Sequence, residues 1–210
     1  MTETEESFAR RRRLMVEEQL EKRGVHDSAV LKAMAEVPRH LFIPEDLWDD
    51  AYSDTPLPLG PEQTISQPLV VAEMLQLLEL KPQFKVLEIG TGSGYEAALL
   101  AKICAEVFTI EIDELLFKWA GIVFQKLGIK NIRQKLGNGY EGWPDASPFD
   151  AIVLSAASPY IPQVLLQQLN LNGRCILPLG QERQELTLVS RTPNGFVQNS
   201  HGGVRFVMMK

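Results

Sequence analysis

The chain is poor in the residues that build disulfide frameworks and metal centres. Its 210 residues include 2 cysteines and 3 histidines. Cys104 and Cys175 lie within apolar runs, so we expect two reduced cysteines in the core and no disulfide. No second histidine or cysteine lies close to His40 in the sequence. The pattern therefore predicts no metal site and no histidine-based triad, and we expect His40 to be structural.

Basic charge and long apolar runs are also scarce. The formal net charge is −6, which argues against a general nucleic-acid binder. No apolar stretch approaches the roughly 20 residues that cross a membrane. The acidic start, residues 1–6, lacks the basic and apolar parts of a signal peptide. We therefore expect a cytoplasmic protein that binds neither nucleic acid nor membrane.

What the chain does have is a glycine-rich turn at its centre. The apolar run Val86–Ile89 is followed by Gly90, Gly92 and Gly94, and a helical pattern then begins. This order predicts strand, tight turn and helix. We expect Gly92 to let a ligand approach the backbone and Gly94 to let the helix pack closely on the strand. The G-x-G-x-G spacing differs from the G-x-G-x-x-G of dinucleotide binders, which disfavours a nicotinamide-dependent oxidoreductase.

An acidic residue follows at the interval expected for a nucleoside site. A second apolar run, Val107–Ile110, ends on Glu111, about 20 residues past the first glycine, where a βαβ unit places a carboxylate on ribose hydroxyls. Asn138 follows a third short strand, 132–136, and is in position to touch a base or sugar, or to serve as a turn residue. Together these features favour an adenosine-containing cofactor.

The rest of the chain supports an α/β fold. Alternating strands and helices between residues 85 and 179 predict a doubly wound, mostly parallel sheet, with two late strands at 185–191 and 204–209. We expect residues 1–80 to form helices and a substrate loop packed on a core of residues 81–210. Residues 52–68 are proline-rich and irregular, which indicates a functional loop. Ser66 and Gln67 precede a helix that begins at Pro68, where the Ser66 hydroxyl either caps the helix or meets an anion.

These motifs resemble the protein-L-isoaspartate O-methyltransferase family, over roughly Met15 to Val207. Thr64–Pro68 is the most specific, because it is similar to that family's own substrate and active-site loop. The other matching stretches are Val37–His40, Val86–Tyr95, Glu111, Tyr140–Pro144, Phe149–Ile152 and Val204–Val207.

The resemblance implies a Rossmann-like methyltransferase with an N-terminal helical extension and S-adenosyl-L-methionine as cofactor. It implies methylation of the free carboxylate of L-isoaspartyl and D-aspartyl residues in damaged proteins, which starts repair through a succinimide. We expect a monomer whose partners are isoaspartyl-containing proteins or peptides. Ser66 is the expected catalytic residue, and Thr64, Ile65, Ser66 and Val204 the expected substrate-binding residues. The cofactor-binding residues implied are Glu88, Gly90, Thr91, Gly92, Ser93, Gly94, Glu111, Asn138 and Gly139.

Three positions depart from the family's usual pattern. Glu62 stands for a glycine, Asn138 for an aspartate, and His201–Gly203 for a segment with a proline before Val204. The first and third lie on the substrate side, so a divergent relative that methylates a dedicated peptide is an alternative. A non-catalytic S-adenosylmethionine-binding interaction protein is another, although the intact Thr64–Pro68 loop argues against it. A carboxylate is already nucleophilic at neutral pH, so the expected reaction needs no strong base.

Overall fold

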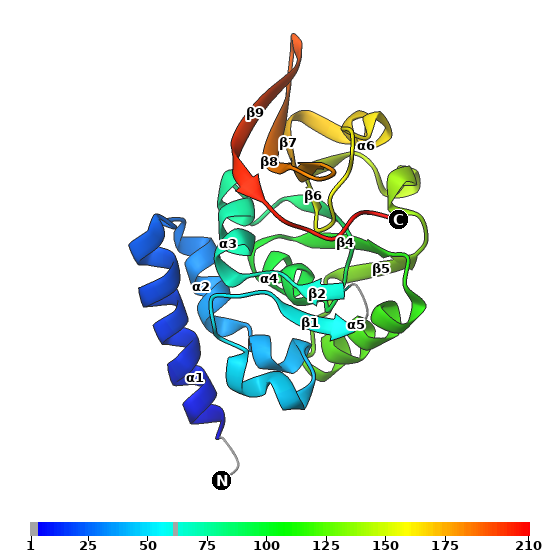
Figure 1. Cartoon of the computed structure of the whole chain (residues 1–210). Helices are drawn as coiled ribbons and strands as arrows, with labels where there is room; N and C mark the ends of the chain where they lie inside the picture. Colours follow the sequence, from blue (N-terminus) through cyan, green and yellow to red (C-terminus); the bar gives the residue numbers. More distant parts are fainter. Residues whose placement is uncertain (1–3, 61–62) are drawn as a thin grey trace.

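The computed structural model describes residues 4–60 and 63–210. Its centre is a seven-stranded sheet (Figure 1). The first five strands in spatial order are parallel, and the last two are antiparallel. This confirms the doubly wound, mostly parallel fold. In spatial order the strands are β5 (Ile132–Leu136), β4 (Glu106–Glu111), β3 (Lys85–Ile89), β6 (Phe149–Leu154), β7 (Leu169–Gly180), β8 (Gln184–Thr192) and β9 (Gly195–Val204).

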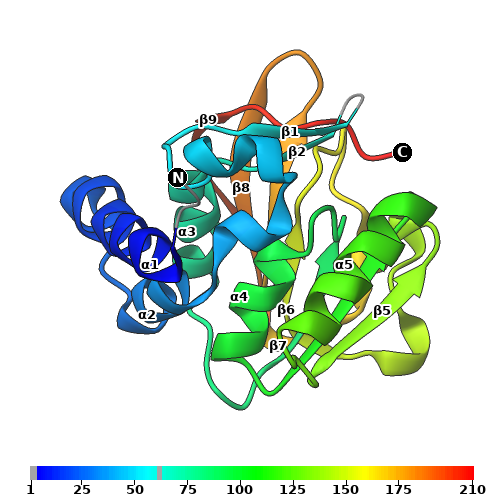
Figure 2. The same cartoon turned by 90° about the horizontal axis from the view of Figure 1, so that it is seen from below.

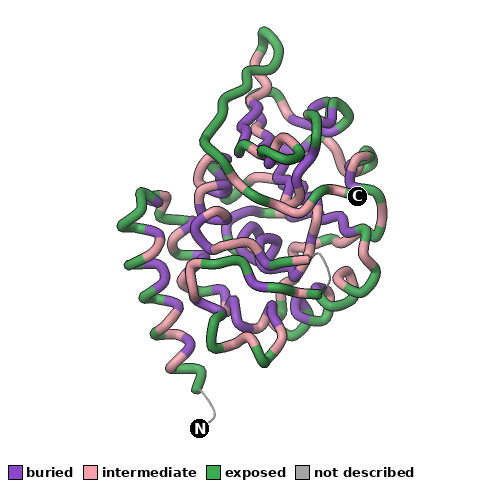
Figure 3. The backbone as a smooth tube through the Cα atoms, viewed as in Figure 1, coloured by how far each residue is buried: buried purple, intermediate pink, exposed green. Residues whose placement is uncertain are grey.

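Helices pack on both faces of this sheet, because alternate residues of its strands point to opposite faces. Val86 of β3 belongs to the hydrophobic cluster formed with helices α1 to α5, whereas Leu87 and Ile89 belong to a second cluster, which contains Leu165 of α6. Buried residues accordingly follow the strands through the middle of the molecule (Figure 3). The helices are α1 (Glu5–Leu14), α2 (Ser28–Glu36), α3 (Pro68–Leu77), α4 (Tyr95–Ile103), α5 (Glu114–Lys126) and α6 (Gln163–Gln167). After α1 the chain stays helical, with π and 3-10 turns, as far as Arg23.

The N-terminal segments form part of the same core as the sheet. The His40 ring stacks on Phe8 at 3.9 Å between ring centroids, and its Nδ1 lies 2.8 Å from the Tyr52 hydroxyl. Burial lowers the pKa of His40 to about 4, so the ring is neutral at pH 7, as expected for a structural residue. Cys104 and Cys175 are free and buried, as predicted. The division at residue 80 stays a prediction. No helix in residues 4–60 and 63–210 is long and apolar enough to span a membrane.

The expectation of an irregular loop over residues 52–68 was wrong. That stretch contains a small antiparallel hairpin, β1 (Leu57–Gly60) and β2 (Gln63–Ile65), with Leu57 paired to Ile65 and both buried. The prolines hid it, since proline lacks a ladder donor and is confined to edge strands. Glu62, one of the departures from the family pattern, lies outside the described residues.

The last predicted strand was also wrong. The prediction placed it at 204–209, but β9 ends at Val204 and pairs antiparallel with β8. Residues 195–203 of β9 are exposed, so they lack the alternation that marks a half-buried strand (Figure 3). The chain beyond β9 returns across the sheet instead. Ala157 donates its backbone N–H to the Val207 carbonyl, and Met209 donates to the Ala157 carbonyl, both at 2.8 Å.

Candidate active site

A cavity opens at the carboxyl ends of β3, β4 and β6, which is where open parallel sheets bind ligands. The glycine-rich turn after β3 forms one wall. The opposite wall comes from β2 and from the C-terminal residues 207–210. In both cartoon views the β1–β2 hairpin and the C-terminal segment run across the same side of the molecule (Figures 1 and 2). Segments from three distant parts of the sequence therefore enclose one space.

Two glycines of the turn have separate tasks. A Cβ atom on Gly94 would lie 2.7 Å from the Phe124 ring of α5 and 3.1 Å from the Ala120 Cβ. Gly94 therefore allows the turn to approach α5, and not the strand as the sequence suggested. Gly92, with φ +53°, would place a Cβ in open space, and it lines the cavity. A ligand can therefore approach the Gly92 backbone closely.

Glu111 fastens this turn to the end of β4. Its Oε2 accepts the Gly92 amide at 2.7 Å, and its Oε1 accepts the Ile112 and Asp113 amides at 2.9 Å. A carboxylate can accept about four hydrogen bonds, so Glu111 can still accept hydrogen bonds from the hydroxyl groups of a ligand. The side chain is 5% exposed and lines the cavity.

Glu88 lies deeper, at the floor of the cavity. Thr109 donates its hydroxyl to Glu88 Oε2, which leaves Thr91 to donate to Thr109 Oγ1, both at 2.5 Å. Burial, with the nearby Glu96 carboxyl as a second cause, raises the pKa of Glu88 well above its usual range. Ser93 accepts the Tyr95 amide at 3.3 Å and so holds the start of α4. Five consecutive cofactor positions were predicted, from Gly90 to Gly94. The first four, Gly90 to Ser93, line the cavity, and Gly94 does not.

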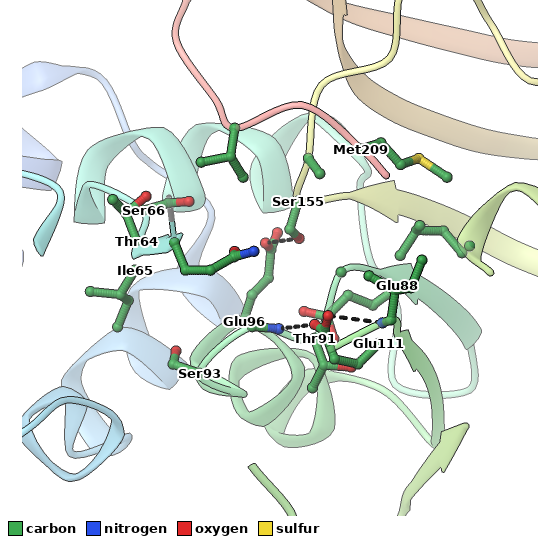
Figure 4. A pocket seen from close by; sticks show the side chains of 18 of the residues that line it. Thr64, Ile65, Ser66, Glu88, Thr91, Ser93, Glu96, Glu111, Ser155 and Met209 are labelled. Carbon is green, nitrogen blue, oxygen red and sulfur yellow. Dashed lines mark hydrogen bonds between the residues drawn. The ribbon is translucent and has the colours of Figure 1, made fainter. Parts of the chain in front are cut away.

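Ser66 lies on the opposite wall with Thr64 and Ile65 (Figure 4). It does not cap α3, because the N-cap residue is Gln67 and makes no side-chain cap bond. The Ser66 carbonyl instead accepts a hydrogen bond from Arg39 Nη2 at 2.9 Å. Arg39 is fully buried and also donates to the Ala51 carbonyl at 2.8 Å, and burial lowers its pKa to about 10. A buried guanidinium thus holds this segment in place.

Three predicted site residues lie outside this lining: Gly94, described above, and Asn138 and Val204. Asn138 is exposed, and its Oδ1 accepts the Tyr140 amide at 2.9 Å, so it caps a short 3-10 turn, whereas the adjacent Gly139 does line the cavity. Val204 lines a neighbouring cavity instead, which shares Thr64 and Ser66 with the first.

The comparisons with known proteins identify the family. The sequence model of protein-L-isoaspartate(D-aspartate) O-methyltransferase matches residues 10–210. The chain is 52% identical to protein-L-isoaspartate O-methyltransferase 1 of Syntrophobacter fumaroxidans over 202 residues, 96% of this chain and 94% of the relative. It is 52% identical to the enzyme of that name from Gloeobacter violaceus over 195 residues, 92% and 95% of the two chains. The chain belongs to this family.

Solved structures agree with this family membership. One protein-L-isoaspartate O-methyltransferase superposes with a TM-score of 0.83 at 30% identity, over 93% of this chain and 65% of that longer one. A Plasmodium falciparum protein-L-isoaspartate O-methyltransferase was crystallised with S-adenosyl-L-homocysteine. It superposes with a TM-score of 0.82 at 26% identity, over 95% of this chain and 98% of that one. The resemblance and the Rossmann-like fold inferred from the motifs are confirmed.

The cavity of this family member also has residues that the motifs did not predict. Glu96, Ser155 and the C-terminal residues 207–210 all line it. Ser155 follows β6, so the rule that ligands lie beyond strand ends would have found it. Glu96 was visible as a charged residue among the apolar positions of α4. The C-terminal segment was predicted as a strand, and its place beside the cavity could not be predicted because that place depends on where the β8–β9 hairpin ends. Within the described residues, no group of three or more His, Cys, Asp or Glu side chains could hold a metal ion.

Proposed function

We propose that this chain methylates the free carboxylate of L-isoaspartyl and D-aspartyl residues in damaged proteins, with S-adenosyl-L-methionine as methyl donor. The observation that carries the proposal is a cavity with two unlike walls. One wall has the glycine-rich turn and Glu111, which suit an adenosine. The other has the Thr64–Ser66 segment, which suits an acceptor carboxylate. The names of the relatives and the product-like ligand in the Plasmodium protein support this assignment.

The residues of the donor wall hold and orient the methyl donor. Glu111 accepts hydrogen bonds from ribose hydroxyls while its bonds to the turn fix its direction. Gly92 leaves its surface open for close approach, and Gly139 also lines the cavity. Bound S-adenosyl-L-methionine supplies an electrophilic methyl group on a sulfonium.

The residues of the acceptor wall place the attacking carboxylate. The Ser66 hydroxyl and backbone amides near the start of α3 orient it, and Arg39 fixes that segment from behind. The C-terminal residues 207–210 keep water from the reacting atoms. The acceptor is already a carboxylate, so methyl transfer from bound S-adenosyl-L-methionine would move no proton and would need no general base from the residues of this wall. Alignment of this kind supplies roughly 7–11 kcal/mol.

The acceptors are isoaspartyl-containing proteins or peptides. The net charge of −6 supports an enzyme that works without nucleic acid, and we place it in the cytoplasm, as a monomer without membrane attachment. Gly203, one of the departures from the family pattern, lines the neighbouring cavity. A preference for one dedicated peptide would therefore be expressed on that side of the acceptor wall.

The test is methyl transfer from labelled S-adenosyl-L-methionine to an isoaspartyl peptide and to its aspartyl twin. Transfer to the isoaspartyl peptide alone supports the proposal. Equal transfer to both peptides would contradict a repair function. Donor binding without transfer to any of a panel of isoaspartyl peptides would favour the dedicated-peptide or non-catalytic alternative.

A further inference from the structure

A positive charge lies buried behind the acceptor wall. It belongs to Arg39, which opens the 3-10 turn Arg39–Phe42 and is 0% exposed. Its Nε donates to the Ala51 carbonyl at 2.8 Å, and its Nη2 donates to the Ser66 carbonyl at 2.9 Å. The third nitrogen, Nη1, is buried as well and has no hydrogen-bond partner. The guanidinium therefore contacts the segment that carries Ser66 and keeps one donor group unmatched.

This charge has no counter-ion in the part of the chain that the structure describes. None of the ion pairs there includes Arg39. The guanidinium carbon lies 5.0 Å from the centre of the Tyr95 ring, and with a pKa of about 10 the group is charged at pH 7. An uncompensated buried charge is costly. Two carbonyls and a ring face offset part of that cost, and an anion bound nearby would offset more of it.

The lining of the cavity does not itself favour an anion. Its charged side chains in residues 4–60 and 63–210 are Glu88, Glu96, Glu111 and Lys210, so acidic groups predominate. The acceptor in the proposed function is nevertheless a carboxylate. A carboxylate that binds at Ser66 therefore needs a source of positive potential on its own side of the cavity.

Arg39 is close enough to Ser66 to supply this potential. Ser66 lines the cavity with Thr64 and Ile65 (Figure 4), and its carbonyl oxygen is the atom that Arg39 contacts. Since one residue spans about 3.8 Å, an anion at the Ser66 hydroxyl lies roughly 7 Å from the guanidinium. With an effective dielectric constant of about 20, the attraction at that separation amounts to about 50-fold in affinity. The same hydrogen bond polarises the peptide between Ser66 and Gln67, which makes the Gln67 amide a stronger donor.

We propose that Arg39 is the electrostatic counterpart of the acceptor: its buried charge draws the isoaspartyl carboxylate to Ser66 without touching it. This inference rests on the proposed function, because it takes the acceptor to be a carboxylate. Arg39 is a positioning residue, since it acts through the Ser66 segment. The attraction exists before methyl transfer and disappears in the uncharged ester. Loss of the charge should therefore raise KM for the peptide and change kcat much less.

The experiment compares two peptides that differ in one group, a carboxamide in place of the isoaspartyl carboxylate. Their binding is measured by calorimetry on the complex with S-adenosyl-L-homocysteine, which has no sulfonium charge of its own. The unmodified protein should bind the carboxylate peptide about 10- to 50-fold more tightly than the carboxamide peptide, and Arg39→Met should reduce this ratio to less than about threefold. Arg39→Lys keeps the charge without the planar fork and should retain most of the ratio. A purely structural role would weaken the binding of both peptides equally.

Two controls separate Arg39 from the surface charges. Arg205 is exposed and lines the neighbouring cavity, so Arg205→Met is the matched control and should keep the ratio of the unmodified protein. The second control needs no substitution, because salt screens exposed charges far more than buried ones. The ratio of the unmodified protein should change by less than about twofold between about 0.05 and 0.5 M sodium chloride.

A ratio that Arg39→Met leaves unchanged would overturn the inference, and so would a ratio that Arg205→Met or salt abolishes. A ratio lost as fully in Arg39→Lys as in Arg39→Met would assign the effect to the hydrogen bonds and not to the charge. Thermal unfolding shows whether each variant is folded, and if Arg39→Met is not, Arg39→Lys and the salt dependence decide. An Arg39-dependent ratio in a protein that methylates no isoaspartyl peptide would refute the proposed function and keep the inference. Methylation of the isoaspartyl peptide with equal binding of both peptides would do the reverse.

Discussion

The two walls of the cavity are built in different ways. The donor wall comes mainly from residues 88–111, a single βαβ unit in which hydrogen bonds from Gly90 and Gly92 tie the turn to the end of β4, and Gly139 adds to it from beyond β5. The acceptor wall joins β2 to the C-terminal segment, about 140 residues apart in the sequence. It is held by a few long-range bonds, from Arg39 to the Ser66 carbonyl and between Ala157 and the final residues.

This difference assigns separate effects to the walls. A local unit positions its ligand through its own backbone, so changes in the donor wall should alter donor affinity for every acceptor. The acceptor wall is assembled only when the whole chain has folded, and it distinguishes two carboxylates of identical charge. Changes there should alter the rate with one peptide and leave donor affinity unchanged. Substitutions that affect both measurements equally would contradict this separation.

The largest effect is expected at Gly92. In Gly92→Val the added side chain enters the space reserved for the donor, at a backbone angle that glycine favours. Affinity for S-adenosyl-L-homocysteine should fall by more than about 100-fold, since a bulky group displaces direct contacts. Gly128→Val is the matched control, because Gly128 has φ +65°, open surroundings and no place in the cavity lining. Equal affinities for the two variants in calorimetry would show that Gly92 serves the turn alone.

The next effect is expected at Glu111. Glu111→Ala should weaken donor binding by about 1.5–3 kcal/mol, the usual contribution of a hydrogen bond to a charged group. The structure adds a second reason for this loss, since the Glu111 carboxylate also accepts the Gly92 amide and so shapes the turn. Glu111→Gln retains one acceptor oxygen and should bind more tightly than Glu111→Ala. Unchanged calorimetric affinity in both variants would remove Glu111 from the site.

The two walls also differ in how much of each could be predicted from the sequence. The donor wall was largely predictable, because the period of β3, the glycine spacing and Glu111 all lie within one local unit. Gly94 was correctly singled out, but its partner is Phe124 of α5, which only tertiary packing reveals. On the acceptor wall Ser66 was singled out by its place before the helix at Pro68 and by the family resemblance, whereas its anchor Arg39 lay in a matching stretch, Val37–His40, to which no role was assigned. A buried arginine bonded to two carbonyls has no sequence period.

Ser66 tests the acceptor wall. Isoaspartyl and aspartyl carboxylates differ by one methylene moved between side chain and main chain, so charge attraction cannot separate them, whereas a fixed donor can. Ser66→Ala should lower kcat/KM for an isoaspartyl peptide by roughly 10- to 100-fold, as for one lost charge-assisted hydrogen bond. Donor affinity should be nearly unchanged. Ser147→Ala removes an exposed hydroxyl outside the cavity lining and should have no effect.

Single-turnover transfer to both peptides measures this change directly. Wild-type rates in Ser66→Ala would reduce Ser66 to a structural residue of the segment that Arg39 holds. A parallel loss of donor affinity would mean that the two walls are not separate, because a change on one would then be felt by the ligand of the other.

The smallest effect is expected at Asn138, at the edge of the donor wall. Its Oδ1 accepts the Tyr140 amide, and an aspartate can accept the same hydrogen bond. The side chain is exposed and does not line the cavity, so a new negative charge there is screened by water. Asn138→Asp should therefore change affinity for S-adenosyl-L-homocysteine by less than about tenfold, a free-energy change below 1.4 kcal/mol.

Asn138→Ala removes the cap and should lower the thermal unfolding temperature, whereas Asn138→Asp should not. A more than tenfold loss of affinity in Asn138→Asp, with the unfolding temperature unchanged, would mean that the neutral amide itself contacts the adenine. In that case Asn138 would belong to the donor wall together with its neighbour Gly139, which already lines the cavity.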